Sequence, residues 1–419
     1  MVVTAKPLIY YLQITPTCQQ HCAGCTNSFK NSRPIDQRDR SALGMSFADW
    51  QDLLTKKIKP HAGSVIFTGG EPTLHPQFGE FLDLVKELEI PFSILTNGFW
   101  SKPQWLVEKL QNSPNFINLH ISLHGSNAKD HESFTLTPNS FHKIIDNIKL
   151  ATRMKLPVST GTVITRWNYS KSSEIVTLCE ELEVGLVNFN RFIGMDWVGV
   201  SASAEQVVYC LRDIQKLKDL GKNIEISTCI PKCFESSATK RCLAGFASCS
   251  IDPWGNVTPC IHTNMMVGSL LVNTIDDIWN SIFFQKWRNL TNKDCICCSL
   301  LEICGGGCKA DIFSSTKSTD FVVSPTSDNR AELPVEFTFL SMPANAKIRA
   351  VFKITKSNNG YVLYKGSKLL SVKTEVVQIL EAIKDRRLCD VEKEWGQTIL
   401  SIVGKLFDDG LVELEQEEK

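Results

Sequence analysis

The chain has 419 residues, which is too long for one ordinary hydrophobic core, so two or three domains are expected. Its 43% of apolar residues is typical of a globular protein, and its 45 basic residues are balanced by 45 acidic ones. Zero net charge argues against nucleic acid or an anionic membrane as a partner, and the lack of a membrane-spanning apolar run or a signal peptide favours a cytoplasmic protein.

Short apolar runs alternate with longer segments of helical period from about residue 8 to residue 225. Strands are expected at residues 8–14, 64–68, 92–95, 117–122, 158–164 and 187–192, and helices at 47–58, 78–88, 104–111, 141–154 and 173–182. Repeated strand–helix pairs indicate a parallel sheet with helices on its outer face. The six expected strands favour an α/β fold of the partial (β/α)6 TIM-type barrel over a closed eight-stranded one.

The rest of the chain changes character three times. Residues 226–312 are rich in cysteine, Gly and Pro, contain one expected helix at 275–290, and have little apolar material for a core of their own. Residues 313–345 read as a linker rich in Ser, Thr and Pro. Residues 346–419 combine expected strands and helices into a small winged-helix-like α+β domain. With the barrel at 1–225, the sequence therefore predicts three domains and a linker.

The sixteen cysteines are clustered rather than scattered. Cys18, Cys22 and Cys25 lie in the loop after the first expected strand, and most of the others lie within the 226–312 block. Because cytosolic thiols stay reduced, such density points to metal rather than to disulfides. The isolated cysteines are expected to be buried small apolar side chains; they are Cys179, Cys210 and Cys389.

The spacing Cys18-x3-Cys22-x2-Cys25 is the strongest single motif. Three thiolates on a short loop can hold three irons of a cubane cluster and leave the fourth iron open for a substrate or cofactor. Zinc with a remote fourth ligand, or chance packing of three cysteines, is the alternative. This triplet before a partial barrel resembles the radical S-adenosylmethionine (radical SAM) superfamily. The resemblance implies a catalytic [4Fe–4S] cluster on these three cysteines, with SAM bound at the open iron.

Further residues agree with this resemblance. Thr68-Gly69-Gly70-Glu71-Pro72, at the end of the second strand, resembles the GGEP motif that meets the SAM amino group. A Gly pair lets backbone approach a ligand closely, and a carboxylate suits an ammonium. Thr96-Asn97-Gly98 and Ser122-Leu123-His124-Gly125 resemble the TNG turn and the Ser-x-Asp-Gly motif. The implied cofactor-binding residues are Gly69, Gly70, Glu71, Pro72, Thr96, Asn97, Ser122, His124 and Thr162, with Asn168 as a further candidate.

Two positions depart from the family pattern. His124 stands where the family has Asp. Gly24 precedes Cys25, where the family usually has an aromatic residue that packs near adenine. Phe29 is a candidate to replace that aromatic side chain.

The cysteine-rich block carries a second pattern. Cys242-x12-Gly255-x4-Cys260, followed by Cys295-x2-Cys298-x5-Cys304-x3-Cys308, resembles the SPASM domain, which carries auxiliary [4Fe–4S] clusters. The resemblance implies one or two such clusters. The first would use Cys242, Cys260 and Cys308 with Cys229 or Cys233, and the second Cys295, Cys298 and Cys304.

The last cysteine of the SPASM pattern, expected shortly after Cys308, is missing. The second cluster would therefore have an open iron or recruit Cys297, Cys249 or a ligand that is not a cysteine. Structural zinc is the alternative for the whole block, because Cys-x2-Cys pairs also occur in zinc ribbons.

Residues 346–419 resemble the PqqD-like domain that binds leader peptides as an added strand. A DNA-binding winged helix has the same outline, but a helix that reads a DNA groove should be basic, and this segment carries Glu392, Glu394, Asp408, Asp409 and four further glutamates near its end. A dimerisation module is a third possibility.

Together these resemblances imply a peptide maturase. It would cleave SAM reductively to a 5′-deoxyadenosyl radical, with electrons from flavodoxin or ferredoxin, and abstract hydrogen from a ribosomally made precursor peptide. Cross-link or thioether formation, epimerisation and backbone excision are the outcomes considered. The alternatives are a maturase or dehydrogenase acting on a folded protein, and a metal-binding scaffold or regulator without enzyme activity.

Overall fold

The computed structural model describes residues 3–25, 27, 44–194, 196, 199–226, 230–231, 233, 242–292, 295–298, 301–314, 346–358, 360–366, 368–395, 398–408 and 410–415. The chain divides into two compact units. The first comprises Ile9–Arg330, and the second combines Val2–Leu8 with Ala331–Lys419. Most of the expected linker, residues 315–345, lies outside the described residues. Among the described helices, none has the length and apolarity needed to cross a membrane.

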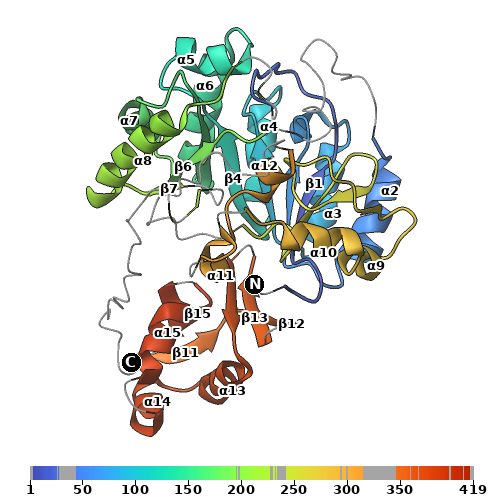
Figure 1. Cartoon of the computed structure of the whole chain (residues 1–419), viewed down its shortest axis with the longest axis vertical. Helices are drawn as coiled ribbons and strands as arrows, with labels where there is room; N and C mark the ends of the chain where they lie inside the picture. The colour runs from blue at the N-terminus through green and yellow to red at the C-terminus, as the bar shows by residue number, and fades with distance from the viewer. Residues whose placement is uncertain are drawn as a thin grey trace. The chain divides into compact units, whose positions relative to one another are not determined.

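The first unit is built on a ten-stranded sheet in the order β10-β9-β8-β1-β2-β3-β4-β5-β6-β7. Neighbouring strands from β1 to β7 are parallel and follow chain order (Figure 1). This confirms the predicted partial barrel: β1 to β6 are the six expected strands, and β7 is a further one. The strands are β1 (Ile9–Gln13), β2 (Ser64–Thr68), β3 (Phe92–Thr96), β4 (Phe116–Ser122), β5 (Val158–Ile164), β6 (Leu186–Arg191), β7 (Ile224–Ile226), β8 (Ser248–Ile251), β9 (Asn256–Thr258) and β10 (Gly268–Ser269).

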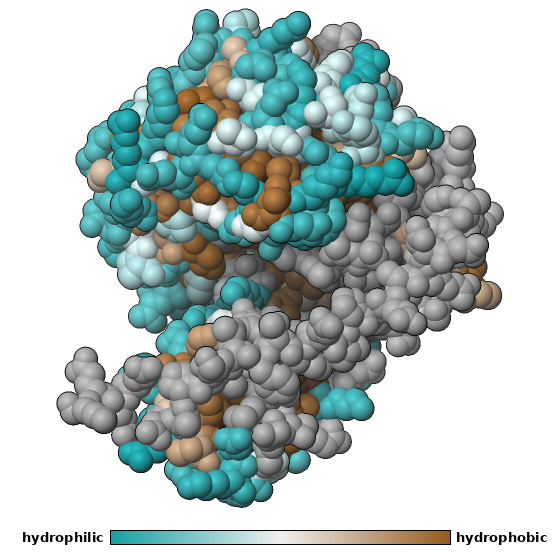
Figure 2. Space-filling model, turned by 90° about the vertical axis from the view of Figure 1, so that its left-hand side faces the viewer, coloured by the Kyte–Doolittle hydropathy of each residue, from teal (hydrophilic) through white to brown (hydrophobic). Residues whose placement is uncertain are grey.

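Helices connect the parallel strands. They are α2 (Phe47–Asp52) with its π-helical continuation η2 (Leu53–Ile58), α3 (Phe78–Glu87), α4 (Pro103–Gln111), α5 (Ala128–Thr135), α6 (Ser140–Arg153), α7 (Ser172–Glu181) and α8 (Ala204–Asp219). Capping boxes fix where α2 and α8 begin, because Ser46 and Ser203 each accept a backbone N–H of the first turn. On the face that carries α7 and α8, hydrophilic residues predominate and apolar ones gather in patches between them (Figure 2).

The cysteine-rich block joins the same sheet. β8 lies parallel to β1, and β9 and β10 continue the sheet as antiparallel strands. The predicted helix 275–290 is two helices, α9 (Ile275–Trp279) and α10 (Ile282–Asn289), because Ser281 caps the second one. Two short helices follow, α11 (Leu301–Cys304) and α12 (Lys309–Ser314).

Contrary to expectation, the cysteine-rich block has an apolar core of its own. Trp279, Phe284 and Trp287 are fully buried, and the rings of Trp279 and Phe284 lie 4.8 Å apart. The indole N–H of Trp287 donates to the carbonyl of Ala244 at 2.9 Å. The segment that follows Cys242 is thereby attached to α10, so aromatic packing as well as metal can order this block.

The described part of the second unit has two small antiparallel sheets and three helices. The three-stranded sheet consists of β12 (Lys353–Ser357), β13 (Gly360–Lys365) and β14 (Lys368–Val372), and β11 (Lys347–Ala350) pairs with β15 (Val412–Glu415). The helices α13 (Thr374–Ile383), α14 (Leu388–Trp395) and α15 (Thr398–Asp408) follow the sheet. Their apolar residues form one core around Leu363, Leu380 and Val403.

Residues 3–5 extend the three-stranded sheet at its β12 edge. Thr4 pairs antiparallel with Ser357, and the N–H of Ala5 donates to the carbonyl of Lys356 at 3.0 Å. Leu8 packs against Val362 on β13. The outer edge of β12 is therefore covered by another part of the same chain.

Candidate active site

The three cysteines of the first motif lie on one loop beyond the carboxyl end of β1. This loop is fixed to α5, because the N–H groups of His21 and Ala23 donate to carbonyls of α5 at 3.1 and 2.8 Å. Cys18, Cys22 and Cys25 are all partly exposed, and all three line one cavity of about 450 Å³. The structure thus brings the predicted cluster ligands to a single cavity at the carboxyl ends of the parallel strands.

The residues of this loop fit an iron–sulfur cluster with an open iron. Among the described residues, no three His, Cys, Asp or Glu side chains are close enough together to hold a single metal ion. A cubane does not require that, because each of its thiolates binds a different iron. Three thiols facing one cavity leave space beside the cluster for a small molecule.

Gly69 and Gly70 hold the second motif against the cysteine loop. The N–H of Gly70 donates to the carbonyl of Thr15 at 2.6 Å, and that of Glu71 to Thr17 at 2.7 Å. A Cβ atom on either glycine would overlap the backbone of Thr15 or Thr17. The close approach of these two segments therefore requires both glycines, and it places both in the cavity wall.

Glu71 lies behind that wall. Its side chain is fully buried and, like that of Pro72, does not line the cavity. Its Oε1 accepts from the hydroxyls of Thr73 and Thr96 at 2.6 and 2.8 Å, and its Oε2 accepts from the N–H of Asn97 at 2.7 Å. Burial raises the pKa of Glu71, and these hydrogen bonds oppose that rise. The carboxylate thus joins the second motif to the turn that follows β3.

Thr96 and Asn97 both line the cavity. The amide of Asn97 lies 3.7 Å from the Cys18 sulfur and 3.2 Å from the side-chain oxygen of Gln19. Hydrogen bonds to a ligating sulfur are one means by which a protein tunes a cluster's potential. Asn97 is therefore placed to act on the first cysteine.

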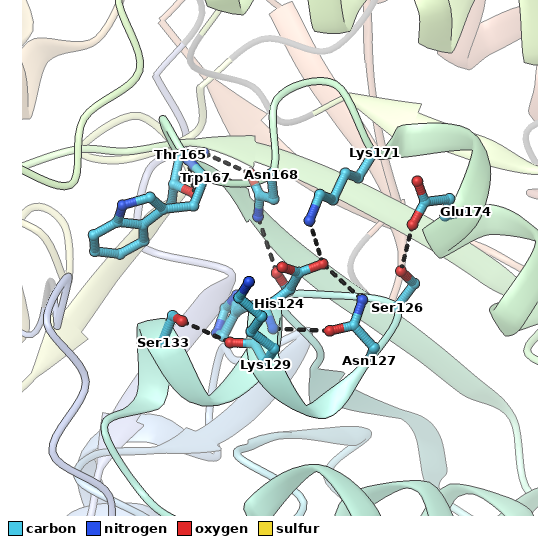
Figure 3. A network of polar contacts seen from close by, with 11 residues as sticks. His124, Ser126, Asn127, Lys129, Ser133, Thr165, Trp167, Asn168, Lys171 and Glu174 are labelled. Atoms are coloured by element: carbon cyan, nitrogen blue, oxygen red, sulfur yellow. Dashed lines mark hydrogen bonds and ion pairs between the residues drawn. The ribbon is translucent and has the colours of Figure 1, made fainter.

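The predicted residues that follow β4 form two groups: some line the cavity, and the others support the loop beside it. Ser122 and His124 line the cavity. Thr162 does not line the cavity. Its hydroxyl instead donates to the carbonyl of Leu123 at 2.6 Å. Asn168 likewise supports the loop, since its amide donates to the carbonyl of His124 at 3.0 Å (Figure 3) and to that of Val163 at 2.9 Å.

The missing aromatic residue of the cysteine loop has a counterpart elsewhere. A Cβ atom on Gly24 would overlap the ring of Phe134 and touch that of Phe192. Phe134, which belongs to α5, is buried and lines the cavity. An aromatic ring from α5 therefore occupies the space beside Gly24. Phe29, the substitute expected from the sequence, lies outside the described residues.

The cysteines assigned to the first auxiliary cluster also come together. Cys242 and Cys260 line the same cavity as the first three cysteines. The pKa of Cys260 is raised well above its usual value by burial, and further by Cys242 and Cys308, so the three thiols are close enough to interact. Cys233 lies in a turn and is partly buried, whereas Cys229 lies outside the described residues.

The cysteines of the second set follow one another through a series of turns. The N–H of Cys298 donates to the carbonyl of Cys295 at 3.0 Å, and Cys304 ends α11. Cys295 is buried, whereas Cys298 and the neighbouring Cys297 are exposed. Cys249 is buried in β8, and burial strongly raises the pKa of its thiol.

The three isolated cysteines differ in exposure. Cys179 on α7 and Cys210 on α8 are buried, as expected, and burial raises the pKa of their thiols to about 11 and about 12. Cys389 on α14 is only partly buried, so it differs from the expectation of a buried apolar side chain.

Sequence reasoning missed several polar residues of the cavity wall, among them Arg191 and His120. Arg191, at the end of β6, has a fully buried side chain and forms an ion pair with Asp311 of α12 at 3.4 Å. His120 of β4 also lines the cavity, and its Nδ1 lies 2.9 Å from the hydroxyl of Ser159. Burial lowers the pKa of His120 to about 4. Charged or polar residues near the carboxyl ends of parallel strands were the available signal.

Comparisons with known proteins agree with this geometry. The radical SAM superfamily model matches residues 12–179, and the model of SPASM, an iron–sulfur cluster-binding domain, matches residues 242–300. An AdoMet-dependent heme synthase from Methanosarcina barkeri is 24% identical over 347 residues, which cover 75% of this chain and 95% of that protein. A PqqA peptide cyclase from Bradyrhizobium diazoefficiens is 23% identical over 326 residues, which cover 74% of this chain and 83% of that protein.

A crystal structure of Streptococcus suis SuiB bound to the precursor peptide SuiA has a similar fold, with a TM-score of 0.63 and 19% identity. The match covers 77% of this chain and 76% of that one. The radical SAM domain binds a [4Fe–4S] cluster and SAM, and the SPASM domain implies auxiliary clusters. The chain is therefore an enzyme of the radical SAM superfamily that carries a SPASM iron–sulfur domain.

Proposed function

We propose that this enzyme modifies a ribosomally made precursor peptide by cross-link or thioether formation, epimerisation or backbone excision. The observation that carries the proposal is the one cavity lined by both the SAM-cluster cysteines and Cys242 and Cys260 of the auxiliary set. The similarity to a PqqA peptide cyclase supports a peptide substrate. When bound, the cluster and SAM supply the 5′-deoxyadenosyl radical that abstracts hydrogen from the substrate.

The chain's own residues would hold the reactants in this cavity. Cys18, Cys22 and Cys25 would bind the catalytic cluster, and the backbone of Gly69 and Gly70 forms the adjoining wall. Cys242 and Cys260 would place an auxiliary cluster beside the substrate, where it can exchange an electron with it. The electron donor that we propose is a flavodoxin or a ferredoxin.

The second unit supplies a site for the leader of such a peptide. Its three-stranded sheet has two outer edges, formed by β12 and β14, and residues 3–5 cover the edge of β12. Among the described residues, β14 pairs with β13 alone. A leader peptide bound as an added strand would therefore pair with β14.

The register of the hairpin formed by β13 and β14 identifies a residue whose substitution tests this site. Lys365 pairs with Lys368 and Val362 with Ser371, so the N–H of Ser371 points away from β13. Ser371→Pro removes that donor without removing a hydrogen bond to β13, and Ser371→Ala is the matched control. With a synthetic precursor encoded beside the gene, we expect Ser371→Pro to weaken binding about tenfold and Ser371→Ala to leave it unchanged.

Peptide modification itself is tested on the anaerobically reconstituted enzyme. With dithionite and SAM, we expect 5′-deoxyadenosine and a change in precursor mass, and neither from a Cys18→Ala/Cys22→Ala/Cys25→Ala variant. SAM cleavage without any change in precursor mass would contradict a peptide substrate. Leader binding that survives in a folded Ser371→Pro variant would contradict the β14 site.

The similarity to an AdoMet-dependent heme synthase favours a second candidate, a tetrapyrrole substrate. A porphyrin in the cavity would change its absorption spectrum on binding and would stimulate SAM cleavage without any peptide. The same reconstituted enzyme distinguishes the two candidates.

A further inference from the structure

His124 completes the hydrogen bonding of the sheet where β4 ends. The last paired residues of β4 and β5 are Ser122 and Gly161, and Leu123 adds one more bond to the carbonyl of Gly161 at 3.0 Å. The next backbone donor on that side of β5 is the N–H of Val163. It donates to Nδ1 of His124 at 3.3 Å, so an imidazole takes the place of a strand carbonyl.

The position of this imidazole is fixed from several directions. The backbone N–H of His124 donates to Nδ1 of His131 at 3.2 Å, and its carbonyl accepts from Asn168. Its ring lies 4.1 Å from the Phe134 ring, measured between centroids, and is stacked on His131 at 5.9 Å. The residue is only 6% exposed. A ring held in this way keeps one orientation.

The hydrogen bond from Val163 also fixes the tautomer. An imidazole nitrogen that accepts a backbone N–H carries no proton, so the proton of the neutral ring lies on Nε2. Burial, and then the neighbouring His131 and His120, hold the pKa of His124 well below its usual value. At neutral pH the ring is therefore uncharged, with a single N–H donor.

His124 belongs to the aromatic part of the cavity wall. Within the described part of the chain, the hydrogen bonds of His124 use its backbone and Nδ1, and the residue lines the cavity. Gly24 and Phe134 form the wall beside it. Near Cys18 the wall is polar, because Asn97, whose amide lies 3.7 Å from the Cys18 sulfur, belongs to it.

SAM has a polar amino-acid half and a flat nucleoside half, and these suit the polar and aromatic parts of the wall respectively. We propose that the neutral imidazole of His124 donates a hydrogen bond from Nε2 to an acceptor on the nucleoside half of bound SAM. An ionised Asp, the usual residue of this motif, can only accept hydrogen bonds. This chain thus presents a donor where its relatives' motif presents an acceptor. The inference rests on the SAM cofactor of the family and does not depend on the identity of the substrate.

Two amide variants separate the roles of the two ring nitrogens. His124→Gln can place an N–H donor near the position of Nε2, whereas His124→Asn can replace the Nδ1 acceptor but does not reach the cavity. On cluster-reconstituted protein, we expect SAM to bind about tenfold more weakly to His124→Asn and within about threefold of wild type to His124→Gln. Equilibrium dialysis measures binding, and iron content with thermal melting checks that each variant is folded and loaded.

The ligand atom is localised with the two halves of SAM. For His124→Asn, we expect weaker binding of 5′-deoxyadenosine and unchanged binding of methionine. The binding of each compound is measured by its effect on the electron paramagnetic resonance spectrum of the reduced cluster. Equal losses for both halves would overturn the nucleoside assignment. A loaded His124→Asn variant that binds SAM as tightly as wild type would show that the histidine acts through Val163 alone, and a loaded His124→Gln variant as impaired as His124→Asn would overturn the donor assignment. If the wild-type protein carries its cluster but does not bind SAM, the premise that this cavity binds SAM is wrong, and the inference is overturned with it.

Discussion

At the scale of single residues, Gly24 and Phe134 show how a family position can be filled from a distant part of the chain. The cysteine spacing predicts that loop from sequence, but nothing in the loop reveals that a ring of α5 fills the place beside Gly24. Such a contact joins positions more than a hundred residues apart. The structure reveals this contact because the loop after β1 and the segment after β4 lie at the same end of the sheet.

This packing makes a testable prediction about volume. Gly24→Phe would force two rings into one space, at a cost of about 1–3 kcal/mol, and should abolish SAM binding. Adding Phe134→Ala should restore binding, because the ring then enters from the loop instead of from α5. Equilibrium dialysis of the single and double variants, with iron content as the control, measures this. A double variant no better than the single one would contradict the exchange.

His131 makes the protein sensitive to acid. Burial lowers its pKa to about 4, whereas an unfolded histidine titrates near 6.5. Between these values the unfolded state binds more protons, so the contribution of the neutral ring is complete above pH 6.5 and is lost as the pH falls through about 4. The shift corresponds to about 3 kcal/mol.

We expect His131→Asn, which can keep an acceptor for the N–H of His124, to flatten this pH dependence. Urea unfolding midpoints between pH 4 and pH 7.5, measured anaerobically on both proteins, provide the comparison. Parallel pH profiles for the two proteins would contradict the assignment to His131.

At the scale of elements, sequence period predicted the barrel strands well and the added strands poorly. Runs such as residues 64–68 are continuous apolar segments, and β2 is buried along its whole length. β8 to β10 are two to four residues long, so they carry no readable period. Residues 348–355 alternate apolar with polar side chains as a single strand would, but they divide between β11 and β12, which join different sheets. Which strand each of these segments pairs with depends on distant parts of the chain, so the local sequence does not predict it.

The pairing of residues 3–5 with β12 is the clearest example, and it can be tested. Ala5→Pro removes the N–H that donates to Lys356 and uncovers the edge of β12. We expect a loss of about 1 kcal/mol or more in the stability of the second unit, and increased self-association. Ala5→Val, which favours a strand, is the control. Hydrogen exchange of the β12 amides and light scattering measure the two effects, and unchanged protection in Ala5→Pro would contradict the pairing.

At the scale of the whole molecule, two sets of cysteines far apart in sequence line one cavity. The sequence predicts each set from its own spacing, but it does not reveal that Cys242 and Cys260 share a wall with Cys18, Cys22 and Cys25. That arrangement follows from β8, which places the cysteine-rich block beside β1 in the same sheet. The auxiliary domain is therefore an extension of the barrel sheet.

This arrangement predicts that the two clusters are separable in composition but coupled in potential. Cys260→Ser should remove about four irons per chain and leave the catalytic cluster, whereas the Cys18→Ala/Cys22→Ala/Cys25→Ala variant should remove a different four. A thiolate-ligated cluster is anionic, and its field is weakly screened across a small cavity. Its loss should therefore raise the midpoint potential of the catalytic cluster, as followed by redox titration with paramagnetic resonance. Full iron content in Cys260→Ser would exclude Cys260 as an essential ligand, and an unchanged potential after loss of its iron would mean that the clusters do not interact.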